Sequence, residues 1–303
     1  MAAVKPVIVQ DLEPEKEELL IKRFLGQRDG YAYFGEQKYL LPKPYEEHVD
    51  GIRCMPLRKD DVWVATFPRS GNGRHVFPSF LPKGAMDDPL FEEIGTGMLM
   101  DYKELVDKPS PRFIKTHLPM SLLSPQLLDT SRVVYVARDP RDVAVSYYHH
   151  NKLLKIHDFS GDFKDYWKLF INDLVYWAPF FEHLREAWEQ RNHPNMLFLF
   201  YEEMYKDLPG VVRRVAKFFE KEYSDEQIQK LCEHLKIDKM KKNKSVHPEW
   251  LQASPLVQEG AESFIRKGKA GGWQEYFDEE MSAEAEKWMQ ENLKKTDMRF
   301  PEV

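Results

Sequence analysis

The sequence predicts an α/β fold, a single globular domain in which a central, mainly parallel β-sheet is flanked by helices. Three short apolar runs, at residues 61–67, 132–137 and 195–200, are rich in β-branched and aromatic residues and predict buried strands. A polar turn and a segment of helical composition follow each run, as they do in parallel sheets with helices on their faces. Ligands of such sheets bind beyond the carboxyl ends of the strands, so we expect the functional residues in these turns.

The remaining elements follow in chain order. Residues 1–60 are mixed and charged, with prolines near their end, and predict short strands and loops that pack on a domain formed by residues 61–303. A short extended run at residues 113–117 separates the first two buried strands. Apolar residues at three- and four-residue spacing predict helices over four further stretches: 163–190, 208–220, 225–236 and 279–293.

The composition limits the kind of protein and ligand. A chain of 303 residues that is 42% hydrophobic and 13% aromatic can bury a sizeable core, which excludes a disordered protein. The net charge of −6 offers no broad basic field for nucleic acid, so we expect a small anionic ligand held by local basic clusters. Cys54 and Cys232 are too few for a disulfide framework or a zinc site. Without a signal-peptide block or a run of ~18 apolar residues, we expect a cytoplasmic protein that binds no membrane.

Two polar clusters near the first strands carry chemistry. Pro68–Gly73 is a small-residue turn with a cation, Arg69, that could present backbone N–H groups to an anion, although a simple tight loop explains it equally well. Lys115 and His117 are two residues apart and lie on one side of an extended run. A cation and a neutral imidazole facing one site supply charge stabilisation and a general base. For an isolated pair, a surface lysine and a hydrogen-bonded histidine are the more ordinary interpretation.

Two further clusters suit phosphate. Arg138 stands at the end of the second strand, and Ser146 lies in the first turns of the helix that follows. Near the C-terminus, Arg266, Lys267 and Lys269 lie in a glycine-rich loop, which is typical of a solvated turn and equally of a phosphate clamp. A nucleoside or small-molecule kinase is disfavoured, because the chain lacks the G-x-x-x-x-G-K-[ST] spacing and an obvious magnesium carboxylate after a strand.

Together these clusters resemble the cytosolic sulfotransferase family, with an arthropod-like member as the nearest type. The words RFIKTHLP, YVARDPRDVAVSYYH, LFLFYEEM and RKGKAGGW are similar to its signature segments, in the same order, and the resemblance runs from about Asp61 to the C-terminus. It implies a P-loop-kinase-like sulfotransferase fold. It also implies transfer of a sulfuryl group from 3′-phosphoadenosine 5′-phosphosulfate to the hydroxyl of a small hydrophobic acceptor, a phenol, steroid or alcohol, without a metal.

The resemblance also implies a role for each matching residue. His117 would take the proton of the acceptor hydroxyl, Lys115 would stabilise charge on the transferring group, and Arg69 stands where the family usually has a lysine. The implied nucleotide contacts are Arg69, Ser70, Gly71, Asn72 and Gly73 at the 5′-phosphosulfate, Arg138, Ser146, Arg266, Lys267 and Gly268 at the 3′-phosphate, and Tyr201 near the adenine. The implied acceptor pocket is apolar, with Phe34, Phe91, Tyr148 and His149 as candidates that core packing explains equally well.

The chain departs from the family in the first loop. Ser70–Gly73 lacks the usual Thr-Thr-Trp, Pro78 and Pro82 interrupt the helix that should follow, and this region is shorter by about a dozen residues, roughly three helical turns. One explanation is a divergent enzyme in which backbone N–H groups still cradle the 5′-phosphate. The other is a splice variant, gene-model error or non-catalytic homologue that binds nucleotide or a hydrophobic ligand. The family's C-terminal dimer motif is also absent, so a homodimer would need another interface.

Overall fold

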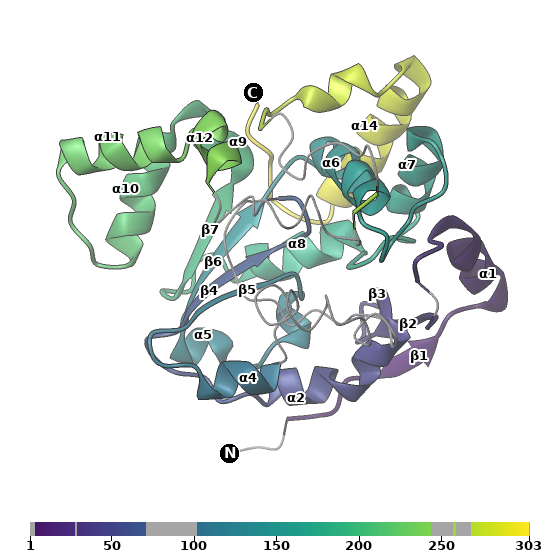
Figure 1. The fold of residues 1–303 in the computed structure, drawn as a ribbon, viewed down its shortest axis with the longest axis horizontal. Helices are drawn as coiled ribbons and strands as arrows, with labels where there is room; N and C mark the ends of the chain where they lie inside the picture. The colour runs from purple at the N-terminus through teal and green to yellow at the C-terminus, as the bar shows by residue number, and fades with distance from the viewer. Residues whose placement is uncertain (1–3, 28, 71–101, 244–256, 259–267, 303) are drawn as a thin grey trace.

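The computed structural model describes residues 4–27, 29–70, 102–243, 257–258 and 268–302. Its centre is a parallel four-stranded sheet in the order β5-β4-β6-β7 (Figure 1). The strands are β4 (Val62–Thr66), β5 (Phe113–Thr116), β6 (Arg132–Ala137) and β7 (Met196–Phe200). The three predicted buried strands are therefore confirmed, and the extended run before His117 is the edge strand β5. This is the α/β architecture that the sequence predicts.

The N-terminal part of the chain forms a second, smaller sheet. Its antiparallel strands run in the order β1-β2-β3, with bounds β1 (Val9–Asp11), β2 (Tyr31–Phe34) and β3 (Tyr39–Pro42). This region also contains helices that the prediction of short strands and loops missed: α1 (Pro14–Arg23), η1 (Lys43–Glu47) and α2 (Val49–Arg53). In α1, Pro14 occupies the first turn, where its missing N–H costs nothing, and acidic residues follow it there.

Helices cover both faces of the parallel sheet. They are α4 (Tyr102–Asp107), η2 (Met120–Leu122), α5 (Leu127–Thr130), α6 (Pro140–Leu153), α7 (Phe163–Ile171), α8 (Phe180–Glu189), α9 (Tyr201–Lys206), α10 (Leu208–Phe218), α11 (Asp225–His234), α12 (Ile237–Lys242), η3 (Gly272–Glu275) and α14 (Glu279–Leu293). The stretch predicted as helical at 163–190 contains two helices, α7 and α8, because Asp173 and Trp177, which lie between them, have φ angles of 59° and 71°, outside the right-handed helical region. None of the helices described here is long and apolar enough to cross a membrane.

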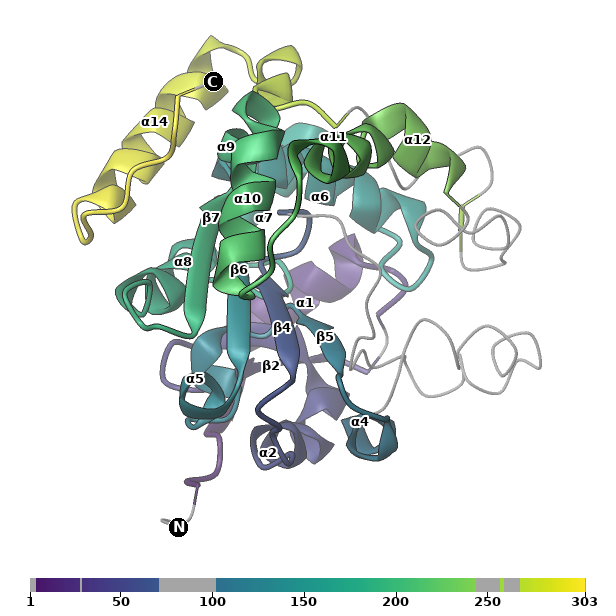
Figure 2. The ribbon, with the colours of Figure 1, turned by 90° about the vertical axis from the view of Figure 1, so that its left-hand side faces the viewer.

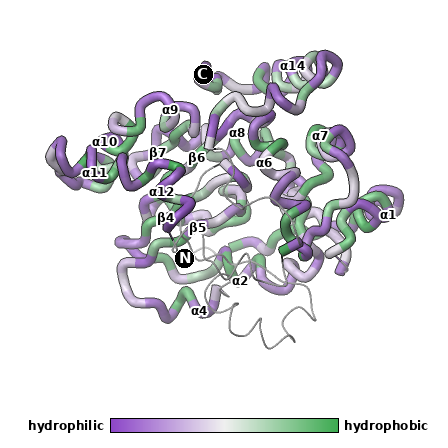
Figure 3. The backbone as a smooth tube through the Cα atoms, turned by 45° about the horizontal axis from the view of Figure 1, so that its top comes forward, coloured by the Kyte–Doolittle hydropathy of each residue, from purple (hydrophilic) through white to green (hydrophobic). Residues whose placement is uncertain are grey.

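Side chains alternate across β6 and so reach two different layers. Val134 and Val136 pack with Val211 of α10 on one face. Val133 and Tyr135 belong to the large core cluster on the other face, which α6, α7 and α8 complete. Figure 1 shows α10 and α8 on opposite sides of the strands, and in Figure 2 α10 lies in front of them. In Figure 3 hydrophilic stretches are prominent on the outer helices α11 and α12. The sheet is thus buried on both faces, which explains its continuous apolar runs.

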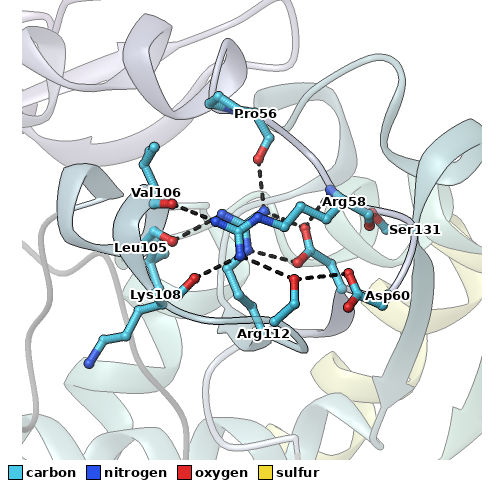
Figure 4. A network of polar contacts seen from close by, with 10 residues as sticks. Pro56, Arg58, Asp60, Leu105, Val106, Lys108, Arg112 and Ser131 are labelled. Atoms are coloured by element: carbon cyan, nitrogen blue, oxygen red, sulfur yellow. Dashed lines mark hydrogen bonds and ion pairs between the residues drawn. The ribbon is translucent and has the colours of Figure 1, made fainter.

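A buried polar network lies at the amino ends of β4 and β5 (Figure 4). Arg112 donates to both carboxylate oxygens of Asp61, and both side chains are almost completely buried. Arg112 also donates to the carbonyl of Leu105, at 3.0 Å, while Arg58 donates to the carbonyls of Val106 and Lys108, at 2.6 and 2.7 Å. These contacts tie α4 to the start of both strands, so they fix where the chain enters β5.

Candidate functional site

The turn after β4 meets the helix after β6. Arg69 has a φ of 71°, in the left-handed region, and its Nε donates to Ser146 Oγ at 3.1 Å. Arg138 donates through Nη1 to the Arg69 carbonyl at 3.2 Å. Ser70 is completely buried, and its N–H donates to the Phe67 carbonyl at 3.2 Å. The structure therefore brings together the cations of the first and third sequence clusters at the carboxyl ends of two neighbouring strands.

Lys115 and His117 lie at the same carboxyl end of the sheet, in β5 and directly after it. Lys115 is the third residue of β5, and His117 is the first residue beyond the strand. His117 Nδ1 lies 2.7 Å from the carbonyl oxygen of Thr66, the last residue of β4. Because a carbonyl oxygen only accepts, Nδ1 carries the ring proton and Nε2 is the basic nitrogen. The sequence predicted the pair but gave no sign that Thr66 orients the imidazole.

Burial and nearby positive charge lower the pKa of both Lys115 and His117. Lys115 is only 8% exposed, and burial, with the Arg69 guanidinium, lowers its pKa to about 8. Burial lowers the pKa of His117 well below its ordinary value, and the Lys115 ammonium lowers that pKa further. His117 is therefore neutral at physiological pH, whereas Lys115 keeps most of its charge. A neutral imidazole beside an ammonium is the combination that a general base with charge stabilisation needs.

A second group of contacts joins α6 to the loop before η3. The guanidinium of Arg138 lies 4.3 Å from the centre of the Tyr201 ring, and its Nη2 donates to the carbonyl of Lys269 at 2.9 Å. Asp142 accepts from the N–H groups of Gly271 and Trp273, at 2.7 and 2.9 Å. This buried carboxylate, which the sequence interpretation left without a role, holds the glycine-rich loop beside Arg138.

Glycine is favoured at position 268 by the backbone conformation and by a close neighbouring side chain. Its φ of 62° lies in the left-handed region, and a Cβ there would come 2.7 Å from Cδ1 of Ile237 in α12. The other residues proposed from the sequence for the nucleotide site and the acceptor pocket lie outside the described part of the chain: Gly71, Asn72, Gly73, Phe91, Arg266 and Lys267. The candidate catalytic and nucleotide residues that the structure does describe are Arg69, Ser70, Lys115, His117, Arg138, Ser146, Tyr201 and Gly268.

The candidate acceptor residues occupy different surroundings. Phe34 is completely buried in β2, edge-on to Tyr45 at 5.9 Å. Tyr148 packs edge-on against Phe163 at 5.6 Å, and His149 Nε2 lies 2.8 Å from the hydroxyl of Tyr276.

The sequence interpretation missed Trp177, whose ring lies 6.0 Å from the His117 ring and 6.1 Å from that of Tyr45. Its one sequence signal is the Trp-Ala-Pro that breaks the helical pattern before α8.

A sheet edge with converging cations and a neutral imidazole defines the class of the protein: an α/β protein with an anion site and a base at the carboxyl ends of its strands. The family model of the sulfotransferase domain matches residues 89–297. The luciferin sulfotransferase of Photinus pyralis is 30% identical over 300 residues, which cover 87% of this chain and 80% of that protein. Sulfotransferase 1E1 of Homo sapiens is 27% identical, with 91% and 98% covered. The chain belongs to the sulfotransferase family, which confirms the resemblance to that family and the expectation of an enzyme.

Solved structures agree with this assignment. The crystal structure of a retinol dehydratase in a complex with retinol and PAP has a TM-score of 0.90 and 38% identity, covering 98% of this chain and 99% of that one. A second structure, of retinol dehydratase with androsterone and the inactive cofactor PAP, has a TM-score of 0.90 and 37% identity, covering 99% of each chain. The expected sulfotransferase fold is therefore confirmed over nearly the whole chain.

Proposed function

We propose that this protein transfers a sulfuryl group from 3′-phosphoadenosine 5′-phosphosulfate to the hydroxyl of a small hydrophobic acceptor, with His117 as the general base. One observation carries the proposal: His117 donates Nδ1–H to Thr66, which leaves Nε2 basic in a site where Lys115 and Arg69 are its charged neighbours. The retinol dehydratase structures support the donor class, because PAP is adenosine 3′,5′-bisphosphate, the product of such a donor.

The described residues fit an anionic nucleotide. Arg138 Nε is buried and has no hydrogen-bond partner among them, so a guanidinium already stacked on Tyr201 keeps a donor for a ligand. Gly268 has a left-handed φ of 62° and lies against Ile237, so this backbone position next to Lys269 has no room for a side chain. In this proposal Arg138, Ser146 and the Gly268 loop hold the 3′-phosphate, and Tyr201 lies near the adenine.

At the reacting end, the chain stabilises charge, takes up a proton and contacts the acceptor. The donor supplies an activated sulfuryl group, and when its sulfur–oxygen bond breaks the electron pair stays on the 5′-phosphate of the departing bisphosphate. Arg69 and Lys115 stabilise the negative charge there. His117 Nε2 takes the hydroxyl proton as the acceptor oxygen approaches sulfur. Trp177, whose ring lies beside that of His117, offers an apolar surface for the carbon skeleton of the acceptor.

A two-stage experiment tests the proposal. Calorimetry measures binding of adenosine 3′,5′-bisphosphate, and transfer from radiolabelled donor is then measured with a panel of phenols, steroids and retinoid alcohols. We expect binding, and transfer that His117→Ala lowers by about 10² to 10⁴. Binding without His117-dependent transfer would leave the non-catalytic homologue as the better description, and no binding would overturn both.

A second candidate reaction is the net loss of water from an alcohol. The retinol dehydratase is 38% identical over 98% of this chain, against 30% for the luciferin sulfotransferase. Sulfation turns the hydroxyl of an allylic alcohol into a leaving group. Departure of sulfate with the carbon–oxygen electron pair, and loss of a proton from the conjugated chain, then form a new carbon–carbon double bond. Mass spectrometry of retinol products separates the two reactions: a sulfate ester supports simple transfer, and retinol less one water supports dehydration.

A further inference from the structure

A second histidine, His183 in α8, is held by hydrogen bonds at both ring nitrogens. It is completely buried. Its Nε2 lies 2.9 Å from the main-chain oxygen of His117, and its Nδ1 lies 2.6 Å from the hydroxyl of Tyr135 in β6. Because the His117 oxygen only accepts, His183 Nε2 carries the proton, and Nδ1 accepts from Tyr135 O–H. The ring hydrogen bonds therefore run from Tyr135 through His183 to the His117 carbonyl, and the Tyr135 hydroxyl also lies 3.2 Å from the main-chain oxygen of His183.

The surroundings of His183 keep this arrangement in one form. Burial lowers the pKa of His183 to about 4, so the ring stays neutral over the physiological range. The rings of Phe67 and Tyr39 meet it edge-on, at 5.6 and 6.2 Å, and both are completely buried. A ring packed in this way cannot turn over without opening the core.

His117 needs such a support because the sheet no longer holds it. The pairing of β5 with β4 ends at Thr116, which lies opposite Ala65. The main chain of His117 is therefore beyond the ladder. Its ring is oriented by the Thr66 carbonyl at the end of β4, and its carbonyl oxygen is held by His183 from α8.

We infer that His183 is a positioning residue for the transfer reaction: together with Tyr135 it fixes the main chain of His117, and so the direction in which Nε2 faces the acceptor. The inference rests on the proposed role of His117 as the base. A base must lie within hydrogen-bond reach of the proton that it takes, and a misplacement of about 1 Å costs on the order of 10²-fold in rate. His183 itself touches no reacting atom in this scheme.

Substitutions of His183 separate positioning from packing. His183→Met removes both ring nitrogens at similar volume, and His183→Gln restores an N–H donor that reaches about as far as Nε2. We expect kcat to fall about 10- to 100-fold in the methionine variant and to recover to within about fivefold of wild type in the glutamine variant. KM for the donor should stay within about twofold in both, because neither substitution touches the residues proposed to bind nucleotide. Tyr39→Phe is the matched control, since the Tyr39 ring packs on His183 but its hydroxyl takes no part in the two hydrogen bonds.

The Tyr135→Phe variant adds a test of the order of the contacts. If Tyr135 acts through the His183 ring, Tyr135→Phe lowers kcat in the wild-type background and has a much smaller effect in the His183→Met background, where only the contact with the main-chain oxygen of residue 183 remains. Additive losses, or a His183→Met enzyme with wild-type kcat, would overturn the inference. Thermal unfolding of every variant identifies any that has simply lost its fold.

A spectroscopic readout keeps this inference distinct from the proposed function. In protein labelled with ¹⁵N-histidine, the Nδ1–H of His117 should give a hydrogen-bonded proton signal that disappears in His117→Ala. We expect this signal to shift or broaden in His183→Met and to stay in place in Tyr39→Phe. Loss of the proposed function would appear as a wild-type protein without transfer activity, whereas an unchanged signal in His183→Met would overturn the positioning role alone.

Discussion

At the scale of single residues, burial at the end of the sheet sets the charge of the reacting groups. The cationic form of Lys115 is disfavoured by its burial and by Arg69, and its pKa falls to about 8. The same surroundings keep His117 neutral far below its ordinary pKa. The two residues are two positions apart in the sequence, yet only the folded environment makes Lys115 a cation and His117 a base.

The Lys115 pKa leads to a prediction about alkaline pH. The ammonium is present below a pH of about 8 and is lost as the pH rises through that value, so kcat/KM should fall by up to about tenfold per unit above it. In Lys115→Arg the guanidinium keeps its charge, and this alkaline decline should disappear. Transfer rates measured across the alkaline range test this, and an unchanged decline in Lys115→Arg would contradict it.

At the scale of elements, the sequence predicted the buried strands well, and three of its four helical stretches match α10, α11 and α14 to within two residues. The buried strands are uninterrupted apolar runs, and β6 has the predicted bounds. The helical pattern at 163–190 continues through a break, because apolar residues recur on both sides of Trp177 while its positive φ ends any helix there. The spacing of apolar residues indicates which side chains are buried. It does not indicate the backbone angles, because these depend on contacts such as that between Trp177 N–H and the Leu40 carbonyl, at 2.9 Å.

The loop before η3 offers a matched pair of glycines. Gly268 and Gly271 both have left-handed φ angles, of 62° and 77°, so alanine is strained by a similar ~1–2 kcal/mol at either position. Among the described residues, the new methyl would meet Ile237 at Gly268, whereas no described atom lies within 4 Å of it at Gly271. We expect Gly268→Ala to weaken binding of adenosine 3′,5′-bisphosphate about tenfold and Gly271→Ala to weaken it less than threefold. Calorimetry measures both, and equal losses would contradict a special role for Gly268.

At the scale of the whole molecule, the sheet is anchored at the end opposite the site. The buried pair of Arg112 and Asp61 and the contacts of Arg58 join α4 to the amino ends of β4 and β5. These two strands deliver Arg69 and His117 to the other end. The network is therefore a structural support for the site, at a distance from its chemistry.

Stability measurements test this support. Arg112→Met leaves the Asp61 carboxylate buried without its partner and should lower the free energy of unfolding by about 3–5 kcal/mol. The control is Arg132→Met, which removes a partly exposed pair with Glu220 and should cost at most about 1 kcal/mol. Urea denaturation followed by circular dichroism gives both values. Similar losses of unfolding free energy in the two variants would contradict the expectation that the buried network stabilises the protein more than an exposed ion pair does.

Local patterns in the sequence were enough to predict the α/β class, the strands and the order of the basic clusters, because apolar runs and turn residues act over a few positions. They also indicated Lys115 and His117 as a pair on one side of a strand. How His117 and Arg69 are held depends on the fold: Thr66, Ser146 and His183 contact His117 or Arg69 across 51, 77 and 66 positions of sequence. Such contacts depend on which strands and helices become neighbours, and no local pattern of residues encodes that.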